Sequence, residues 1–274
     1  MMGASPRQQQ SSLGTSMSRP TDTRPQTIVT AAILVIGDEI LSGRTQDKNM
    51  AWLAVRLNEL GVQLREARVV PDIEAEIVAG VNALRARYDY VFTTGGIGPT
   101  HDDITADSIA AAFGVGIDYH PEAMAILTRH YEISGIEFNE ARKRMARIPL
   151  GATLINNPVS KAPGFNIENV YVMAGVPTIM QAMFEEIAPD LKGGAKMLSR
   201  TIGAGLPEGR VAAKLGELQA RYPTVSMGSY PYFKEGSVGT NLVLRSVDRE
   251  ALDAAFEALF DWLAREGVVA VETS

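Results

Sequence analysis

The chain has 274 residues and a mass of 29.5 kDa, and 46% of its residues are hydrophobic against 21% charged. This composition excludes a disordered chain, because it supplies enough apolar surface to offset the entropy of folding. The absence of cysteine excludes disulfides, thiolate metal sites, cysteine nucleophiles and iron–sulfur clusters, and we expect a reducing, cytoplasmic location. The net charge of −6 and the pI of about 5.2 argue against long nucleic acids as partners.

Residues 1–27 differ in composition from the rest of the chain. They combine a run of three glutamines with serine, threonine, proline and arginine, and contain little that could pack in a core. This pattern predicts a disordered tail. The composition is also that of a transit peptide, but amphipathic periodicity is missing, so an untargeted tail is favoured. No stretch of the chain approaches the ~18 apolar residues of a membrane span, and we expect no membrane partner.

Residues 28–194 are predicted to form an α/β domain, because short apolar runs alternate with helical patterns from Thr30 onward. Such alternation is typical of parallel strands joined by crossover helices. We expect strands at 30–36, 62–70, 89–94, 152–155 and 170–174. We expect helices at 48–60, around 73–84, and at 103–113, 121–133, 137–147 and 178–191.

The pattern restarts after the linker-like Lys192-Gly193-Gly194, and residues 195–274 are predicted to form a smaller α+β domain. Its strands are expected at 197–202, 224–230, 237–246 and 268–271. Its helices are expected at 208–220 and 248–265.

Two loops that follow predicted strands carry acidic side chains and glycines. In open α/β sheets, ligands bind beyond the carboxyl ends of the strands. The first loop, 37–43, places Asp38 and Glu39 after a buried strand, where they could hold a hard cation or be acids of a solvated turn. The second, 94–105, has three glycines that let a ligand approach the backbone, and the next helix offers free N–H groups to an anion.

A simpler role exists for the acids of the second loop. Asp102 or Asp103 could cap the helix expected at 103–113, because aspartate is a preferred N-cap residue. Capping would not need the glycine run, so a functional role is favoured. His101 in this loop is a candidate ligand contact or acid–base group.

Two further loops are less informative on their own. Residues 156–165 are rich in turn formers and contain one cation, Lys161, so a plain loop is favoured there. Residues 174–177 place Pro177 at a helix start. The chain has no phosphate loop ending in Gly-Lys-Ser/Thr, no complete dinucleotide fingerprint, no Gly-x-Ser-x-Gly elbow and no helical histidine pair for zinc.

Taken together, four stretches carry a family resemblance. They are Gly37-Asp38-Glu39-Ile40-Leu41 with Asn49 downstream, Gly95 to Thr105, Asn157-Pro158 through Ala162-Pro163-Gly164-Phe165, and Gly175-Val176-Pro177. They resemble the molybdopterin-binding domain of the competence- and damage-inducible CinA family over about residues 30–192. Arg200-Thr201-Ile202-Gly203 and Gly228-Ser229-Tyr230-Pro231 resemble the small domain that follows in that family.

The resemblance implies a three-layer α/β/α sandwich, similar to MoaB, MogA and the gephyrin E domain, followed by a small α+β domain. Members of this superfamily bind molybdopterin or adenylylate it with magnesium and ATP. CinA-type domains are similar to ADP-ribose pyrophosphatases, and a related domain is fused to eukaryotic FAD synthase. Neither the amidase domain of CinA nor a FAD synthase domain is expected here, so amidase activity is not expected. A homo-oligomer, dimer or trimer, is implied.

We therefore expect a metal-dependent hydrolase of a nucleotide pyrophosphate, of the ADP-ribose or FAD type. In this hypothesis Mg²⁺, with Mn²⁺ or Co²⁺ as alternatives, is held by Asp38, Asp102 and Asp103. Glu39 or one of these aspartates positions water, and Lys161 neutralises developing charge. The other residues expected to contact phosphate or ligand are Gly37, Asn49, Gly95, Gly96, Gly98, Pro99, Thr100, His101, Thr105, Asn157, Ala162, Pro163, Gly164, Gly175 and Pro177.

Two alternatives remain open at this point. One is molybdopterin binding or adenylylation in molybdenum cofactor biosynthesis, and the other is a pterin-binding module without turnover. The chain has Ser160-Lys161 where the family usually has a pair of small residues, and Met173-Ala174 where it usually has Leu-Pro. The added Lys161 cation favours phosphate but could change which substrate fits.

Overall fold

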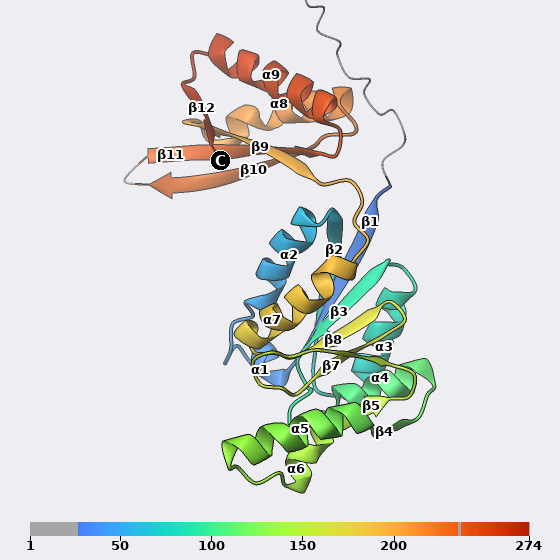
Figure 1. The fold of residues 1–274 in the computed structure, drawn as a ribbon. Helices are drawn as coiled ribbons and strands as arrows, with labels where there is room; N and C mark the ends of the chain where they lie inside the picture. Colours follow the sequence, from blue (N-terminus) through green and yellow to red (C-terminus); the bar gives the residue numbers. More distant parts are fainter. Residues whose placement is uncertain (1–26, 235–236, 274) are drawn as a thin grey trace, which may run out of the picture.

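A computed structural model describes residues 27–234 and 237–273, so the tail predicted at 1–27 lies, except for its last residue, outside the described residues. The first large unit is a six-stranded sheet of order β2-β1-β3-β8-β7-β6 with helices on both faces (Figure 1). The predicted three-layer α/β/α sandwich is thereby confirmed.

The inner strand β1 (Val29–Ile36) is buried on both faces because its residues alternate between two cores. Ala31, Ile33 and Val35 belong to one core, and Ala32, Leu34 and Ile36 belong to the other. Its neighbours β2 (Val62–Val70) and β3 (Tyr90–Thr94) run parallel to it, as expected.

The two helical layers follow from the spacing of apolar residues along each helix. On one face α2 (Asn49–Glu59) and α7 (Pro177–Ile187) pack side chains such as Leu53, Leu57 and Phe184 against the sheet. On the other face, α3 (Glu74–Arg85) and α4 (Thr105–Phe113) contribute Ile77 and Ile109, among others. The helix expected at 178–191 ends as the short 3₁₀ turn η2 (Ala188–Asp190).

The far side of the sheet is antiparallel, which the sequence did not predict. The strand β8 (Val170–Met173) is parallel to β3, but β7 (Gly164–Ile167) runs antiparallel to β8 and to β6 (Thr153–Ile155). β7 was missed because it is four residues long and a tight turn joins it to β8, so it has no crossover helix to mark it.

The helix expected at 137–147 is wrong for most of its length. After α5 (Pro121–Ser134), the chain forms only α6 (Glu140–Lys143), the 3₁₀ turn η1 (Arg144–Ala146) and the strand β5 (Arg147–Pro149). The β5 strand pairs with β4 (Ile117–Tyr119), another strand that was not expected. Pairing with β4 buries Ile148 and places Pro149 where a helix could not continue.

The second unit is a four-stranded antiparallel sheet of order β10-β11-β9-β12 with two helices on one face (Figure 1). Its strands are β9 (Leu198–Ala204), β10 (Ser226–Lys234), β11 (Ser237–Ser246) and β12 (Ala270–Thr273), and its helices are α8 (Glu208–Arg221) and α9 (Arg249–Arg265). Every predicted element of this unit is present, and the unit has its own core. None of the helices in the described ranges is long and apolar enough to cross a membrane.

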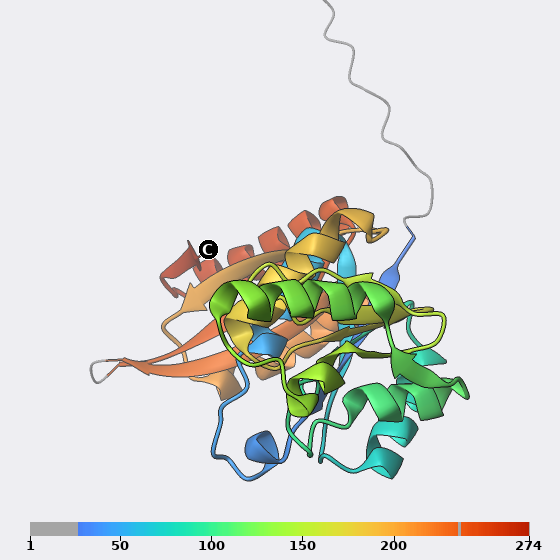
Figure 2. The ribbon, with the colours of Figure 1, turned by 60° about the horizontal axis from the view of Figure 1, so that its bottom comes forward.

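The two units are joined by a tightly packed glycine junction. Gly194 N donates to Gly61 O at 2.9 Å, and Ala195 N donates to Thr27 O at 3.0 Å. A Cβ on Gly61 would lie 2.3 Å from Gly194 O, and one on Gly193 would lie 1.8 Å from Leu60 O. The small unit is thus fastened beside the start of β1, at the opposite end of the molecule from α5 and α6 (Figures 1 and 2).

Candidate functional site

The loops that follow β1, β3 and β8 meet at one edge of the sheet, because these strands are parallel neighbours. Gly95 N donates to Met173 O at 3.2 Å, which joins the loop after β3 to the end of β8. A Cβ on Gly175 would lie only 3.2 Å from Gly95 Cα. The side-chain amide of Asn49, at the start of α2, donates to Gly175 O at 2.7 Å. The predicted residues of three loops are therefore brought together.

The glycine loop after β3 is locked into a shape that side chains could not adopt. Gly95 has a φ of 107°, and a Cβ there would lie 2.1 Å from Ile36 O. Gly96 has a φ of 65°, and its Cβ would lie 2.2 Å from Thr105 Oγ1. Thr105 is fully buried and ties the loop to the first turn of α4 by donating from Oγ1 to Gly95 O at 3.0 Å.

Asp103 organises the loop and does not cap the helix. Its Oδ2 accepts from Thr100 N at 2.8 Å and from Thr100 Oγ1 at 2.5 Å. A Cβ on Gly98 would lie 2.6 Å from the same oxygen. The helix starts at Thr105, with Ile104 at the N-cap position and no side-chain cap. The expectation that Asp102 or Asp103 caps a helix starting at 103 is wrong, because the carboxylate of Asp103 closes the preceding turn.

A group of acidic side chains gathers on the other side of this edge. Asp38 starts the short helix α1 (Asp38–Leu41), and its N–H donates to Asp72 Oδ2 at 2.9 Å. Partial burial raises the pKa of the Asp72 carboxyl, the bond from Asp38 N lowers it, and the charges of Asp38, Glu39 and Asp102 raise it further. These four carboxylates therefore share one negatively charged region.

Asp72 is a residue that the sequence reasoning missed. It follows β2 directly, as Pro71-Asp72, so it also stands beyond the carboxyl end of a parallel strand. That position was the signal that could have identified it. The predicted metal set of Asp38, Asp102 and Asp103 is not assembled: within residues 27–234 and 237–273 no three acidic or histidine side chains converge on one point.

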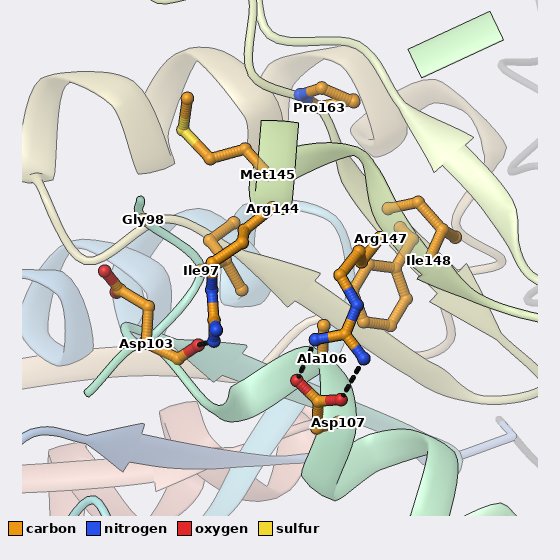
Figure 3. A pocket seen from close by; sticks show the side chains of 12 residues that line it. Ile97, Gly98, Asp103, Ala106, Asp107, Arg144, Met145, Arg147, Ile148 and Pro163 are labelled. Atoms are coloured by element: carbon orange, nitrogen blue, oxygen red, sulfur yellow. Dashed lines mark hydrogen bonds and ion pairs between the residues drawn. The ribbon is translucent and has the colours of Figure 1, made fainter. Parts of the chain in front are cut away.

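Two arginines that were not predicted lie against the glycine loop (Figure 3). A small pocket of about 20 Å³ separates Gly96, Gly98 and Asp103 from Arg144 and Arg147. This volume holds about one water molecule, so a ligand here would need the facing segment to move.

The two arginines differ in how they are held. Arg147 forms a bidentate ion pair with Asp107, at 2.9 and 2.6 Å (Figure 3). Arg144 reaches only the carbonyl oxygen of Asp103, at 3.5 Å, and its Nε is buried without a partner among the described residues. The run of cations from Arg142 to Arg147 was visible in the sequence, but it was assigned to a helix that the chain does not form.

The third loop is organised by its own residues. Asn157 is buried; its Nδ2 donates to Ala162 O at 2.7 Å, and its Oδ1 accepts from Val159 N and Ser160 N at 3.1 Å each. Lys161 has a φ of 66°, and its ammonium donates to Pro158 O at 2.9 Å. The structure therefore places Lys161 on its own loop, and Arg144 and Arg147 are the cations next to the glycines.

The remaining predicted residues fall into three kinds of position. Gly164 lies inside β7, where a Cβ would be 2.2 Å from Val172 O, so its role is strand packing and not ligand contact. The side chain of His101 is 98% exposed, with Nδ1 3.9 Å from Asp102 Oδ1. Gly37 donates its backbone N–H to Val70 O, and Pro163 lines the pocket between the glycine loop and the arginines. Pro177 begins α7, and Pro99 is exposed.

Comparison with family models divides the chain in two. Residues 32–193 match a family described as "Probable molybdopterin binding domain", and residues 196–272 match one described as "FAD synthase, middle domain".

Curated relatives align with most of the chain. A protein of Aeropyrum pernix is 38% identical over 225 residues, covering 78% of this chain and 82% of its own length. A "Probable FAD synthase" of Caenorhabditis elegans is 33% identical over 259 residues, covering 86% of this chain. A "CinA-like protein" of Desulforapulum autotrophicum is 35% identical over 211 residues, covering 72% of this chain. The chain spans about half the length of each of the last two.

Among solved structures, the crystal structure of the protein CinA from Thermoplasma acidophilum superimposes with a TM-score of 0.55. It is 32% identical, and the match covers 60% of this chain and 98% of that one.

Proposed function

Since the chain belongs to the molybdopterin-binding domain family and carries a CinA-like domain of that kind, we propose that it hydrolyses the pyrophosphate bond of a small nucleotide with the help of a divalent metal ion. The bond would be of the type found in FAD or ADP-ribose. The products would be two phosphomonoesters, formed when water attacks one phosphorus and the other phosphate departs.

The observation that carries this proposal is the glycine loop between acids and arginines. At Gly95, Gly96 and Gly98 a Cβ would clash with Ile36 O, Thr105 Oγ1 and Asp103 Oδ2, so the tight turn of this loop requires glycine at all three positions. Arg144 and Arg147 stand on one side of the loop. A pyrophosphate, with its several anionic oxygens, would be held by backbone N–H groups and by arginine.

The carboxylates of the acidic region are suitable ligands for a hard cation. Because protein side chains alone do not form a complete set of ligands among the described residues, the substrate would supply the others. Mg²⁺ is commonly bound by one or two carboxylates together with substrate phosphates. Asp38 and Asp102 would supply these carboxylates, with Mn²⁺ or Co²⁺ as alternatives to Mg²⁺. When bound, the metal would neutralise charge on the phosphate oxygens. Glu39 or Asp72 would orient the attacking water by accepting its hydrogen bond.

The small C-terminal domain favours a substrate of the FAD type. Residues 196–272 match the middle domain of FAD synthase, and relatives named FAD synthase align across both halves. The same site could instead bind molybdopterin, with or without its adenylylation, which is the alternative favoured by the description of the matched family.

Turnover assays on the purified full chain would test the proposal. FAD, ADP-ribose, and ATP with molybdopterin would each be incubated with Mg²⁺, Mn²⁺ or Co²⁺, and with a chelator, and the products identified by chromatography. We expect AMP from FAD or ADP-ribose only when a metal is present. Adenylylated pterin would favour cofactor synthesis, and tight pterin binding without any product would leave a binding module.

A matched pair of variants makes the assay specific to the site. Asp102→Asn removes a carboxylate from the acidic region, whereas Asp261→Asn removes an exposed carboxylate from α9 in the small domain. We expect the first variant to lose at least 100-fold in kcat/KM and the second to stay within twofold. Equal activities of the two variants would contradict the assignment.

A further inference from the structure

A second cavity lies away from the candidate site, in a cleft between the two domains. Its volume is about 360 Å³, which falls in the range of small-molecule sites. Gln63 and Arg65 of β2 line one side, and Ser226, Arg245 and Ser246 of the small domain line the other. Gln63 lies near the start of β2, so the cleft is at the amino end of the parallel strands, opposite the glycine loop.

The cleft is held open by the junction that joins the domains. The side chain of Asn58 exchanges two hydrogen bonds with the backbone of Met197, each of 3.2 Å. Gly61 and Gly194 are in direct backbone contact. Because these contacts fix the connecting segment, the distance between the two walls of the cleft is set before a ligand binds.

The charge of the cleft is positive although the chain has a net charge of −6. Arg65 and Arg245 are its two charged lining residues among those described, and no acidic side chain lines it. Within the described ranges, neither arginine forms an ion pair. Two guanidinium groups without acidic partners in one cleft favour an anionic ligand.

A buried hydrogen-bond donor in the cleft wall also lacks a partner. Gln63 is 6% exposed, and its Nε2 has no hydrogen-bond partner among the described residues. Arg65 Nη2 donates to Gln63 Oε1 at 2.5 Å, which identifies the other amide atom as the N–H₂ group. In the neighbouring Gln219, by contrast, Nε2 donates to Val225 O and Oε1 accepts from Met227 N. Gln63 Nε2 is therefore a donor in a cleft-lining residue for which the described residues supply no acceptor.

We propose that this cleft binds the phosphate group of a small molecule, held by Arg65, Arg245 and the amide of Gln63. All three groups are donors, and arginine matches the several acceptor oxygens of a phosphate. Ser226 and Ser246 add hydroxyl groups. Since the two arginines come from different domains, the ligand ties the domains together. The site does not depend on the chemistry proposed at the glycine loop.

Calorimetric titration of the full chain with inorganic phosphate, AMP and adenosine tests this proposal. We expect phosphate or AMP to bind, and adenosine not to bind. AMP binding more tightly than phosphate would identify a phosphate ester as the ligand, and equal affinities would identify free phosphate. A wild-type protein that binds neither, or that binds adenosine as tightly as AMP, would overturn the proposal.

Matched variants locate the binding. Arg65→Gln and Arg245→Gln should each raise the dissociation constant at least 10-fold, and Gln63→Met should raise it about threefold or more. Arg210→Gln is the control, because it removes the same charge from the first turn of α8, whereas the cleft residue Gln219 lies near the end of that helix. We expect this control to change the dissociation constant less than twofold. Thermal unfolding checks that each variant folds. Binding that persists unchanged in both cleft arginine variants would place the phosphate elsewhere and refute the site.

Discussion

Asn49 and Gly175 are 126 residues apart in the chain, yet the side-chain amide of Asn49 donates to the carbonyl oxygen of Gly175 at 2.7 Å. Asn49 is 3% exposed and begins α2, and Gly175 contacts Gly95 of the glycine loop. One partly buried hydrogen bond thus connects the start of α2 to the loop after β8. Its loss leaves a carbonyl group without its partner.

Replacing Asn49 by alanine should therefore affect both stability and ligand binding. We expect the free energy of unfolding to fall by about 1 to 2 kcal/mol and KM to rise severalfold, as measured by chemical denaturation and steady-state kinetics. Asn58→Ala is the matched control, because Asn58 is an amide of the same helix that bonds to Met197 at the domain junction. A KM that rises equally in both variants would show that general loosening is responsible.

Gly96→Ala and Gly114→Ala should separate backbone strain from steric exclusion. Both glycines have a φ of 65°, but a Cβ on Gly96 meets Thr105 Oγ1 at 2.2 Å, whereas nothing lies within 4 Å of one on Gly114. Each variant should lose about 1 kcal/mol from left-handed strain, and Gly96→Ala should lose more. Only Gly96→Ala should lower kcat/KM, by at least 10-fold. Equal kinetics in the two variants would show that the shape of this loop is not required.

Asp102 and Asp103 should have separable effects, because Thr100 N and Thr100 Oγ1 both donate to Asp103 and so close the turn. Asp102→Ala should change the free energy of unfolding by less than about 0.5 kcal/mol, while kcat/KM falls sharply. Asp103→Ala should cost about 1 to 2 kcal/mol of stability, since two hydrogen bonds to a charged group are lost. Urea denaturation beside activity assays gives both quantities. An Asp102 variant that loses stability in proportion to activity would point to a structural role.

Arg144→Gln should raise KM about 10-fold, because the variant removes a cation beside the glycine loop without breaking an ion pair of the described residues. Lys143→Gln is the matched control: it removes a charge from the adjacent residue, whose ammonium bonds to Glu140 on the surface. The KM values should be compared at two salt concentrations, because a long-range charge effect would be screened and shared by both variants. Indistinguishable KM values would exclude Arg144 from the site.

The ion pair between α2 and α7 should make stability depend on pH in the acidic range. Arg56 donates to both carboxylate oxygens of Glu185, at 2.7 and 2.9 Å, and these bonds lower the pKa of Glu185. The stabilisation is therefore complete above the ordinary pKa of glutamate and is lost as the pH falls through the lowered value. Glu185→Gln should cost about 0.5 kcal/mol at pH 7 and nothing once wild-type Glu185 is protonated. Thermal unfolding across pH 3 to 7 would measure this convergence, and a pH-independent difference would contradict it.

The sequence by itself determined the elements whose signals are local and periodic. The apolar run at 30–36, the apolar spacing of α2 and α3, and the complete set of elements in the small domain were all predictable, because each leaves a continuous or periodic apolar pattern in the sequence. The glycine run at 95–98 and the acids at 38, 39 and 102 were visible for the same reason, since each lies beside a recognisable strand end.

Only the tertiary structure decided what depends on partners distant in sequence. β7 forms because β6 and β8 flank it, and β5 replaces a helix because β4 pairs with it. Contacts between distant segments likewise place Arg144 and Arg147 beside the glycine loop and Asp72 beside Asp38, whereas Lys161 bonds within its own loop. Pairing energies between distant segments outweigh local helix propensity, and a single sequence carries no record of those pairings.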